Sequence, residues 1–210
     1  VFSELGERIQ GLSHPDRFAL YLTSRGVTNE TYYVGQKYAR IVGTNNVDNS
    51  ARLCHSPSTS GLKDTLGVAA TTCSYKDWFD SDLIIFIGSN PANDQPVSIK
   101  YLIEAKARGA EVLSINTFKE PGMMKYWVPS NTRSAVFGDE VSNRFYMVHT
   151  GGDLAFFNAA AKLLMDQGGE DTDFIQIDVN GLPEYRAALE AQSLERLIEL
   201  AGTTREDLDD

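Results

Sequence analysis

Two short segments of the sequence carry side chains that could do chemistry. The first is Cys54-His55-Ser56-Pro57-Ser58, where a thiol lies beside an imidazole. A thiolate can bind a transition metal or act as a nucleophile, and a neighbouring histidine can carry a proton near neutral pH. The structural alternative is a small buried cysteine beside a partly exposed histidine. A zinc site is unsupported, because only His14 and His149 remain and neither has a recognised spacing.

The second segment is Gly88-Ser89-Asn90-Pro91-Ala92, directly after the apolar run 83–87. Glycine lets the backbone approach a ligand closely, and free amide groups before a helix favour an anion. The carboxyl end of a parallel strand is where α/β sheets bind phosphate-bearing ligands, although an ordinary strand-to-helix turn is the alternative. The chain lacks G-x-G-x-x-G, G-x-x-x-x-G-K-[ST] and G-x-S-x-G motifs. The segment therefore indicates neither a nicotinamide dinucleotide site, a P-loop ATPase nor an α/β-hydrolase.

Two further polar segments follow predicted strands. Asn116-Thr117-Phe118-Lys119-Glu120-Pro121 comes after the apolar run 111–115, where it could read a base or a ribose, since Asn116 can both donate and accept hydrogen bonds. Thr150-Gly151-Gly152-Asp153 opens a helical pattern and fits an anion-binding or capping turn. The alternatives are a polar strand end for the first segment and an ordinary N-cap by Asp153 for the second.

Alternating strand and helix patterns predict how these segments are positioned. Residues 83–87 are continuously apolar, as strands covered on both faces are, a helix follows over 97–108, and residues 111–115 form the next strand. Such a βαβ unit has a right-handed crossover. Before this unit, the sequence predicts a strand over 18–22, a helix from Thr28 or Asn29 to about Ile41, a polar loop over 45–50 and a short helix over 61–66. After it, the sequence predicts a helix from Gly152 or Asp153 to about Gln167. Two or three short helices are predicted after 170, with starts near Pro183 and Ser193. Residues 144–148 fit either a strand or an extended lead-in to the helix at 153.

The charge is unevenly distributed along the chain. Residues 166–210 carry 13 Asp and Glu against 3 Arg, whereas residues 1–165 carry 16 acidic and 16 basic residues, so the net charge of −10 lies in the tail. A neutral body with an acidic tail is a poor nucleic-acid binder. We expect the tail to be a solvated helical surface.

Length and composition limit the remaining classes. A chain of 210 residues with 42% hydrophobic residues can form one large domain or two small ones with a real core. It contains no apolar run of 18 residues and no visible signal peptide, so we expect no membrane segment and a cytoplasmic location. It also lacks an initiator Met, and we expect a fragment. Cys54 and Cys73 cannot supply a four-cysteine metal site and are expected to be free thiols. We interpret Cys73, His14 and His149 as structural and Trp78 and Trp127 as packing residues.

Taken in register, these segments resemble the molybdopterin oxidoreductases of the dimethyl-sulfoxide-reductase superfamily, in particular the formate-dehydrogenase-like alpha subunits. The resemblance spans about residues 15–170 and rests on CHSPSTSGL (54–62), DLIIFIGSNPA (82–92), EAKARGA (104–110), NTFKEP (116–121) and TGGDLAF (150–156). It implies an α/β fold, namely a three-layer Rossmann-like domain with a mostly parallel sheet and helices on both faces. It also implies a bis(molybdopterin guanine dinucleotide) cofactor with molybdenum or tungsten, one guanine dinucleotide of which this domain would hold.

The same resemblance implies roles for individual residues. Cys54 would occupy the metal-ligand position, which relatives fill with cysteine or selenocysteine, and His55 matches a histidine implicated in proton transfer in formate dehydrogenases. Asn116 falls where many relatives have the Asp of an Asp-Pro-Arg run, so the hydrogen bonds to the guanosine would differ here. The implied catalytic residues are Cys54 and His55, and the implied cofactor-binding residues are Gly88, Ser89, Asn90, Asp94, Asn116, Thr117, Lys119, Gly151, Gly152 and Asp153.

We expect residues 1–210 to form a single α/β cofactor-binding domain of a larger subunit, with 170–210 as an acidic helical extension. No iron–sulfur cluster is ligated by this chain. The expected partners are a small-molecule substrate, the remaining domains of the same subunit and an electron-transfer partner, with neither nucleic acid nor membrane. The sequence leaves open the substrate and the choice between molybdenum and tungsten. It also leaves two alternatives, a noncatalytic nucleotide-binding or interaction module on the same scaffold and a hydrolase that uses Cys54 as its nucleophile.

Overall fold

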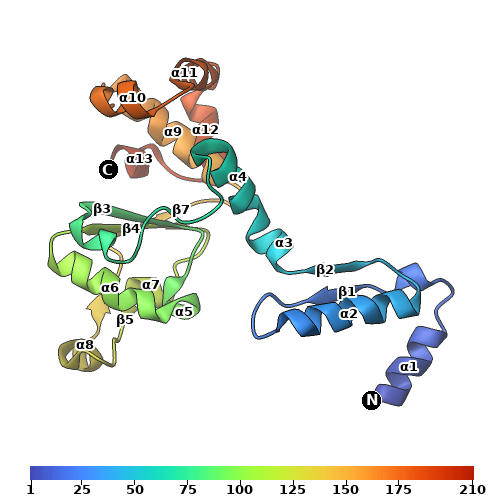
Figure 1. Cartoon of the computed structure of the whole chain (residues 1–210). Coiled ribbons are helices and arrows are strands. Elements are labelled where there is room, and N and C mark those ends of the chain that lie inside the picture. The colour runs from blue at the N-terminus through green and yellow to red at the C-terminus, as the bar shows by residue number, and fades with distance from the viewer. The chain divides into compact units, whose positions relative to one another are not determined.

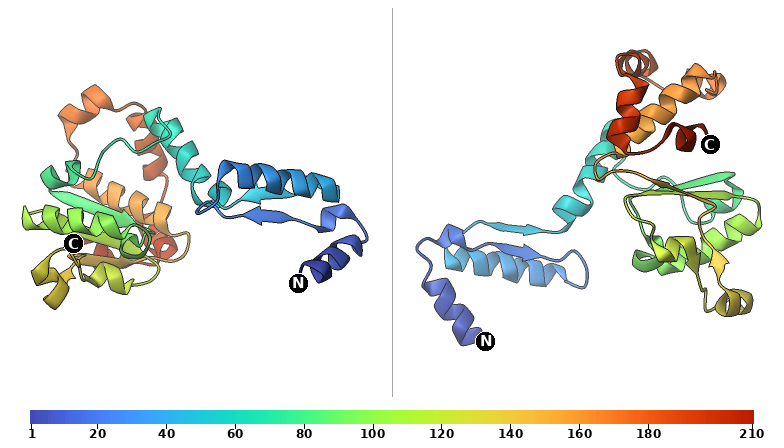
Figure 2. Two further views of the ribbon diagram at one scale, coloured as in Figure 1. Left: turned by 60° about the horizontal axis from the view of Figure 1, so that its bottom comes forward. Right: turned by 180° about the vertical axis from the view of Figure 1, so that it is seen from behind.

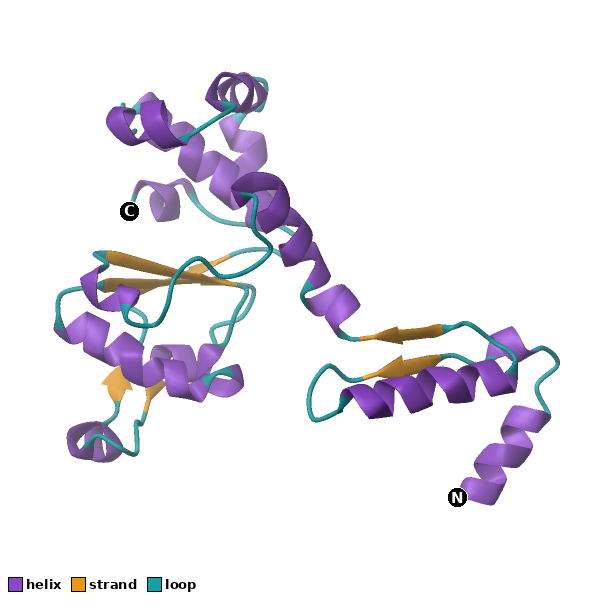
Figure 3. Ribbon diagram, viewed as in Figure 1, coloured by secondary structure: helices purple, strands orange, loops and turns teal.

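A computed structural model describes residues 1–210 and consists of alternating helices and short strands (Figure 3). The chain divides into two compact units, Val1–Thr72 and Cys73–Asp210. They are called the N-terminal unit and the C-terminal unit, and each is described by itself. The expectation that residues 1–210 act as one domain of a larger subunit stays a prediction.

The N-terminal unit is built around one β-α-β segment. Helix α1 (Phe2–Gln10) and the short 3-10 helix η1 (Pro15–Arg17) precede β1 (Leu20–Leu22), α2 (Asn29–Val42) and the parallel strand β2 (Val47–Asn49). Thr28 caps α2 by accepting a hydrogen bond from the Thr31 amide, and Gly43 ends it with φ of 101°, as the sequence predicts. Helices α3 (Ala51–Cys54) and α4 (Ser56–Leu66) complete the unit.

One prediction for the N-terminal unit is wrong, and a second is confirmed with an earlier start. Residues 45–50 are not simply a polar loop, because 47–49 pair with β1 through the backbone, and the polar side chains of Asp48 and Asn49 conceal this strand. The helix expected over 61–66 begins at Ser56, since Pro57 fits the first turn of a helix, where no amide donor is needed. The segment 56–58 is therefore the start of α4 and not a free loop.

The C-terminal unit is organised by a parallel sheet of three strands in the order β3-β4-β7. These are β3 (Leu83–Ile87), β4 (Glu111–Asn116) and β7 (Arg144–Met147), with Ile87 opposite Ile115 and Asn116 opposite Met147. The predicted strands 83–87 and 111–115 are thus confirmed, and the undecided segment 144–148 forms a strand. Helix α6 (Pro96–Ala107) connects β3 to β4, as expected from the helical pattern.

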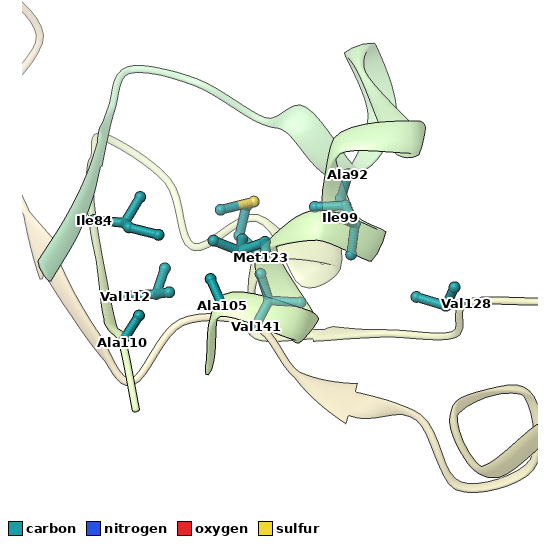
Figure 4. Packing of buried hydrophobic residues seen from close by; sticks show 10 residues of the cluster. Ile84, Ala92, Ile99, Ala105, Ala110, Val112, Met123, Val128 and Val141 are labelled. Carbon is teal, nitrogen blue, oxygen red and sulfur yellow. The ribbon is translucent and has the colours of Figure 1, made fainter. Parts of the chain in front are cut away.

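Helices cover both faces of this sheet and create two hydrophobic cores (Figures 1 and 2). On one face, α6 lies with the short helices α5 (Pro91–Asp94) and α7 (Pro121–Met124). Their core, shown in Figure 4, consists of Ile84, Ala92, Ile99, Leu102, Ala105, Ala110, Val112, Met123, Val128 and Val141. On the other face, α9 (Asp153–Asp166) and α12 (Leu194–Ala201) pack in a core of Ile115, Tyr146, Val148, Ala155, Phe156, Ala159, Leu197 and Ala201. The expected three-layer α/β fold is confirmed.

Strand β3 departs from its expected environment. Its alternate residues Leu83, Ile85 and Ile87 are exposed, although Ile84 is buried against α6. The reason is that β3 lies at the edge of the sheet, while α9 and α12 pack over β4 and β7. The prediction that this strand is covered on both faces is therefore wrong for the unit as described.

The acidic tail is also more than a solvated surface. It forms α10 (Thr172–Asp178), α11 (Leu182–Glu190), α12 and α13 (Arg205–Asp209), with Pro183 in the first turn of α11 and Ser193 capping α12. Leu189, Leu197 and Ala201 of this tail are buried, so the prediction of a purely solvated tail is wrong. The remaining elements are η2 (Asp77–Asp80), the antiparallel pair β5 (Lys125–Tyr126) and β6 (Asp139–Glu140), and α8 (Thr132–Phe137). No helix is long and apolar enough to cross a bilayer.

Candidate functional site

The carboxyl ends of β3, β4 and β7 bring three predicted loops to one edge of the sheet. Gly88 follows β3, and its amide donates to the Ile115 carbonyl oxygen at 2.9 Å. The Val148 amide, one residue beyond β7, donates to the Asn116 carbonyl oxygen at 3.1 Å. This register places the loops that begin at Gly88, Asn116 and His149 next to one another. The edge is where a parallel α/β sheet binds its ligands.

The loop after β3 combines open backbone with a buried acceptor. Gly88 has φ of 58°, and a β-carbon added to it would meet no atom within 4 Å, so the space beside this glycine is empty of protein. Ser89 and Asn90 are half-buried, and the Asn90 side-chain oxygen Oδ1 is buried without a hydrogen-bond partner. Asp94, at the end of α5, is exposed. A buried polar atom without a partner at a ligand-binding edge suits a ligand that supplies a donor.

The loop after β4 offers an amide, a hydroxyl and a cation. The Asn116 side-chain oxygen accepts a hydrogen bond from the Thr117 amide at 2.8 Å, which leaves the side-chain nitrogen to donate elsewhere. Thr117 and Lys119 are exposed, and the Lys119 ammonium lies 6.0 Å from the centre of the Phe145 ring. An ammonium group so weakly held is free to pair with an anion.

The loop after β7 leads into α9. Gly151 has φ of 81° and open space beside it, whereas Gly152 is buried. The alternative of an ordinary N-cap by Asp153 is wrong, because Gly152 holds the N-cap position without a side-chain hydrogen bond and Asp153 is the first residue of α9. The amide groups of this helix end therefore keep their capacity to bind an acceptor.

Cys54 and His55 belong to the N-terminal unit, whereas the three loops at the sheet edge belong to the C-terminal unit. Cys54 is the last residue of α3, and its amide donates to the Ser50 carbonyl oxygen at 2.9 Å. His55 separates α3 from α4, and its carbonyl oxygen accepts a hydrogen bond from the Thr59 amide. Cys54 carries a free, exposed thiol and His55 is exposed, so the alternative of a buried structural cysteine is wrong. An exposed thiolate is available to a metal that another part of the molecule brings.

The chain alone builds no metal centre. No cluster of three or more His, Cys, Asp or Glu side chains could hold an ion. A metal at Cys54 would therefore have to arrive with most of its ligands already in place, as a metal bound to an organic cofactor does.

The donors and acceptors of the sheet edge fit a ligand that carries both phosphates and N–H or O–H groups. Phosphates fit the open space beside Gly88, the first amides of α9 and the Lys119 ammonium. The unpaired Asn90 oxygen suits a ligand N–H or O–H. A ligand that carries phosphates together with ribose hydroxyls or ring N–H groups would satisfy both sets, so the residues present fit a nucleotide.

His149, which the sequence analysis interprets as structural, also lies at this edge. It lies two residues beyond β7, exposed, and its amide donates to the Ala201 carbonyl oxygen of α12 at 2.7 Å. Because the sequence leaves the strand 144–148 undecided, it gives no signal that His149 follows a strand.

Comparison with known proteins places these features in a wider context. A family model described as molybdopterin oxidoreductase matches residues 2–170. The chain is 30% identical to Protein YdeP of Escherichia coli over 100% of its length and 30% of the relative's. It is 35% identical to Probable oxidoreductase YjgC of Bacillus subtilis, over 99% of this chain and 19% of the relative. Formate dehydrogenase H of Escherichia coli is 28% identical over 97% of this chain and 27% of the relative.

A solved structure shares the fold. Acetylene hydratase from Pelobacter acetylenicus superposes with a TM-score of 0.59 at 16% identity, over 98% of this chain and 26% of that chain. At this identity the likeness shows the fold alone. The chain spans between 19% and 30% of the length of the three curated relatives named above.

Proposed function

Because this chain belongs to the molybdopterin oxidoreductase family, we propose that its C-terminal unit holds one guanine dinucleotide arm of a bis(molybdopterin guanine dinucleotide) cofactor. The observation that carries the proposal is the buried Asn90 oxygen without a partner at the carboxyl edge of the sheet. A buried acceptor left unpaired costs about 1–3 kcal/mol, and a ligand donor removes this cost. The diphosphate of a dinucleotide is fully ionised at neutral pH and carries no donor, so the Asn90 oxygen would accept from a ribose hydroxyl or a ring N–H, while its side-chain nitrogen can donate to a phosphate.

The remaining residues of the edge divide the ligand between them. The backbone at Gly88 and Gly151 comes close to the phosphates, with Ser89 and Thr117 as hydroxyl donors and Lys119 as a counter-charge. Asn116 donates to the guanosine through its side-chain nitrogen. The carboxylates of Asp94 and Asp153 offer acceptors to guanosine N–H and O–H groups. Gly152 lets this loop pass close to the backbone of Ala201.

Cys54 and His55 supply the reactive part of the proposal. The bound cofactor's metal, molybdenum or tungsten, supplies the two-electron redox change. Cys54 would bind that metal through its thiolate, which suits a soft ligand position. His55 would take up the proton that a substrate releases, because an imidazole exchanges protons at neutral pH. The whole protein would then be a formate-dehydrogenase-like oxidoreductase that acts on a small molecule and passes electrons to a partner, with the remaining domains of its subunit enclosing the cofactor.

The test is an analysis of the full-length subunit purified from its natural host. We expect about one molybdenum or tungsten atom per chain and guanine nucleotide released on acid denaturation. Asn90→Ala should lower the nucleotide recovered per chain several-fold. Asn93→Ala, which changes an exposed side chain of the same type three residues further along, in α5, should leave it unchanged. A well-folded subunit without metal and without nucleotide would favour the noncatalytic module instead.

A further inference from the structure

The loop 149–153 is bonded to the end of α12, a helix of the acidic tail. The His149 amide donates to the Ala201 carbonyl oxygen at 2.7 Å, and the Gly152 amide donates to the His149 carbonyl oxygen at 2.8 Å. Helix α12 spans residues 194–201, so it lies outside the 2–170 region that the family model matches. A segment beyond the matched region therefore contacts the predicted dinucleotide loop directly.

Two glycines make this contact close. A β-carbon added to Gly152 would lie 2.7 Å from the Ala201 carbonyl oxygen, an atom of the backbone that cannot turn aside. A β-carbon added to Gly202 would lie 2.3 Å from Cγ and Cδ2 of the His149 ring. Gly202 also has φ of 69°, and it ends α12. Both positions are thus filled by the only residue that permits this approach.

The loop needs such support because of its own composition. Gly151 and Gly152 are adjacent, and glycine loses more conformational freedom on ordering than any other residue. Strand β7 is an edge strand of only four residues, so the sheet holds the loop from one side alone. The buried side chains of Leu197 and Ala201 anchor α12 in the core with Ala155 and Phe156 of α9. The end of α12 is therefore a fixed point against which the loop can rest.

We propose that Ala201 and Gly202 are positioning residues for the dinucleotide loop. Their backbone fixes the path of residues 149–153, so that the open backbone of Gly151 and the first amides of α9 stay beside Asn116 at the sheet edge. The inference rests on the proposed function of that edge. It gives the acidic tail a role in cofactor retention that its charge does not reveal.

The experiment uses Gly202→Ala in the full-length subunit, with Gly168→Ala as the matched control. Gly168 has nearly the same φ, 66°, but no atom within 4 Å of an added β-carbon, so it reproduces the backbone strain without the clash. We expect hydrogen exchange at the His149 and Gly152 amides to become about tenfold faster in Gly202→Ala than in Gly168→Ala. Guanine nucleotide recovered per chain should fall several-fold in Gly202→Ala only.

A second substitution tests the mechanism of the clash. His149→Ala in the Gly202→Ala background removes the ring that the new methyl group meets, so exchange and nucleotide recovery should return to the Gly168→Ala level. The inference is overturned if Gly202→Ala matches Gly168→Ala in exchange, if the second substitution does not rescue, or if exchange changes while nucleotide recovery does not. A wild-type subunit without guanine nucleotide would refute the proposed function, whereas the exchange of the two amides would still decide whether α12 holds the loop.

Discussion

The two units differ in how much of their structure is buried, and the residues proposed to bind the cofactor lie in a different unit from those proposed to react. In the N-terminal unit only Ala39 and Thr44 are buried, yet this unit carries Cys54 and His55. In the C-terminal unit two hydrophobic cores support a parallel sheet, and the three loops that are predicted to bind a dinucleotide follow its strands at one edge. A binding edge on a well-packed scaffold is organised before its ligand arrives, whereas a segment with few buried contacts has low local stability. Cys54 therefore lies in a unit that has few buried residues of its own to hold it in place.

The largest expected effect is a loss of activity that leaves the stability of the protein unchanged. Cys54→Ala in the full-length subunit should lower activity at least about 100-fold, because losing a metal ligand should cost no less than losing one of its supporting partners. The unfolding free energy should stay within about 0.5 kcal/mol of wild type, since the Cys54 side chain is exposed. The measurements are activity, metal content and urea unfolding of the variant and the wild-type subunit. A fully active Cys54→Ala or Cys54→Ser subunit would remove Cys54 from the metal.

The unfolding free energy should depend strongly on a side chain of the C-terminal unit and little on one of the N-terminal unit. Leu102 is 0% exposed in the first core of the C-terminal unit, while Leu53 is 75% exposed beside Cys54. Leu102→Ala should lower the unfolding free energy by about 2–5 kcal/mol, because it removes buried methyl groups and leaves a cavity. Leu53→Ala should change it by less than about 0.5 kcal/mol. Urea unfolding followed by circular dichroism measures both.

The two tryptophans make that measurement specific to one unit. In the 210-residue chain both tryptophans, Trp78 and Trp127, lie in the C-terminal unit, so the tryptophan fluorescence of this chain follows the unfolding of that unit. If Leu53→Ala shifted the fluorescence transition as far as Leu102→Ala does, the contrast between the units would be wrong.

Two buried serine side chains form a hydrogen bond beside the first core. The hydroxyl groups of Ser114 on β4 and Ser142 lie 2.6 Å apart, and both residues are almost fully buried. Ser114→Ala or Ser142→Ala alone should cost about 1–3 kcal/mol, because the remaining hydroxyl loses its partner away from water. The double alanine variant should cost less than the sum of the two single variants. Additive costs in this double-mutant cycle would mean that the two hydroxyls do not depend on each other.

The sequence predicted elements where local chemistry decides them. Thr28 and Gly43 bracket α2 with a side-chain cap and a left-handed glycine, and the apolar runs of β3 and β4 need no distant partner to be recognised. The three loops at the sheet edge were also predictable, since the carboxyl ends of neighbouring parallel strands meet at one edge. By contrast β2 escaped prediction, because its short polar sequence becomes a strand only through pairing with β1.

The rest of the candidate site depends on contacts that leave no local pattern. The bond from His149 to Ala201 joins residues far apart in the chain, and nothing in either segment predicts it. The burial of the Asn90 oxygen likewise follows from how α5 packs, and not from the Gly-Ser-Asn-Pro turn. Sequence could therefore nominate Asn90 as a binding residue, but only the structure shows that its oxygen lacks a partner.

The smallest expected effect is a pH dependence confined to the C-terminal unit. The Tyr146 ring is 8% exposed, and its hydroxyl donates to an Asp210 carboxylate oxygen at 2.8 Å. Burial raises the pKa of Tyr146 above its ordinary value of about 10. The folded state thus keeps the phenol proton at a pH where the unfolded chain has lost it. This contribution to stability is complete below pH 10 and is lost as the pH rises through the folded pKa.

Tyr146→Phe should therefore cost about 0.5–1.5 kcal/mol at pH 7, and this difference from wild type should shrink above pH 10. Lys106, whose pKa is lowered by burial, titrates in both proteins and cancels in the comparison. The control is Tyr33→Phe in the N-terminal unit, where the tyrosine is 65% exposed and the substitution should change the unfolding free energy by less than about 0.5 kcal/mol. Urea unfolding at pH 7, 9 and 10.5 provides the measurement. Parallel profiles for wild type and Tyr146→Phe would mean that the phenol is as solvated in the folded unit as in the unfolded chain, and the second core would then be looser than its burial indicates.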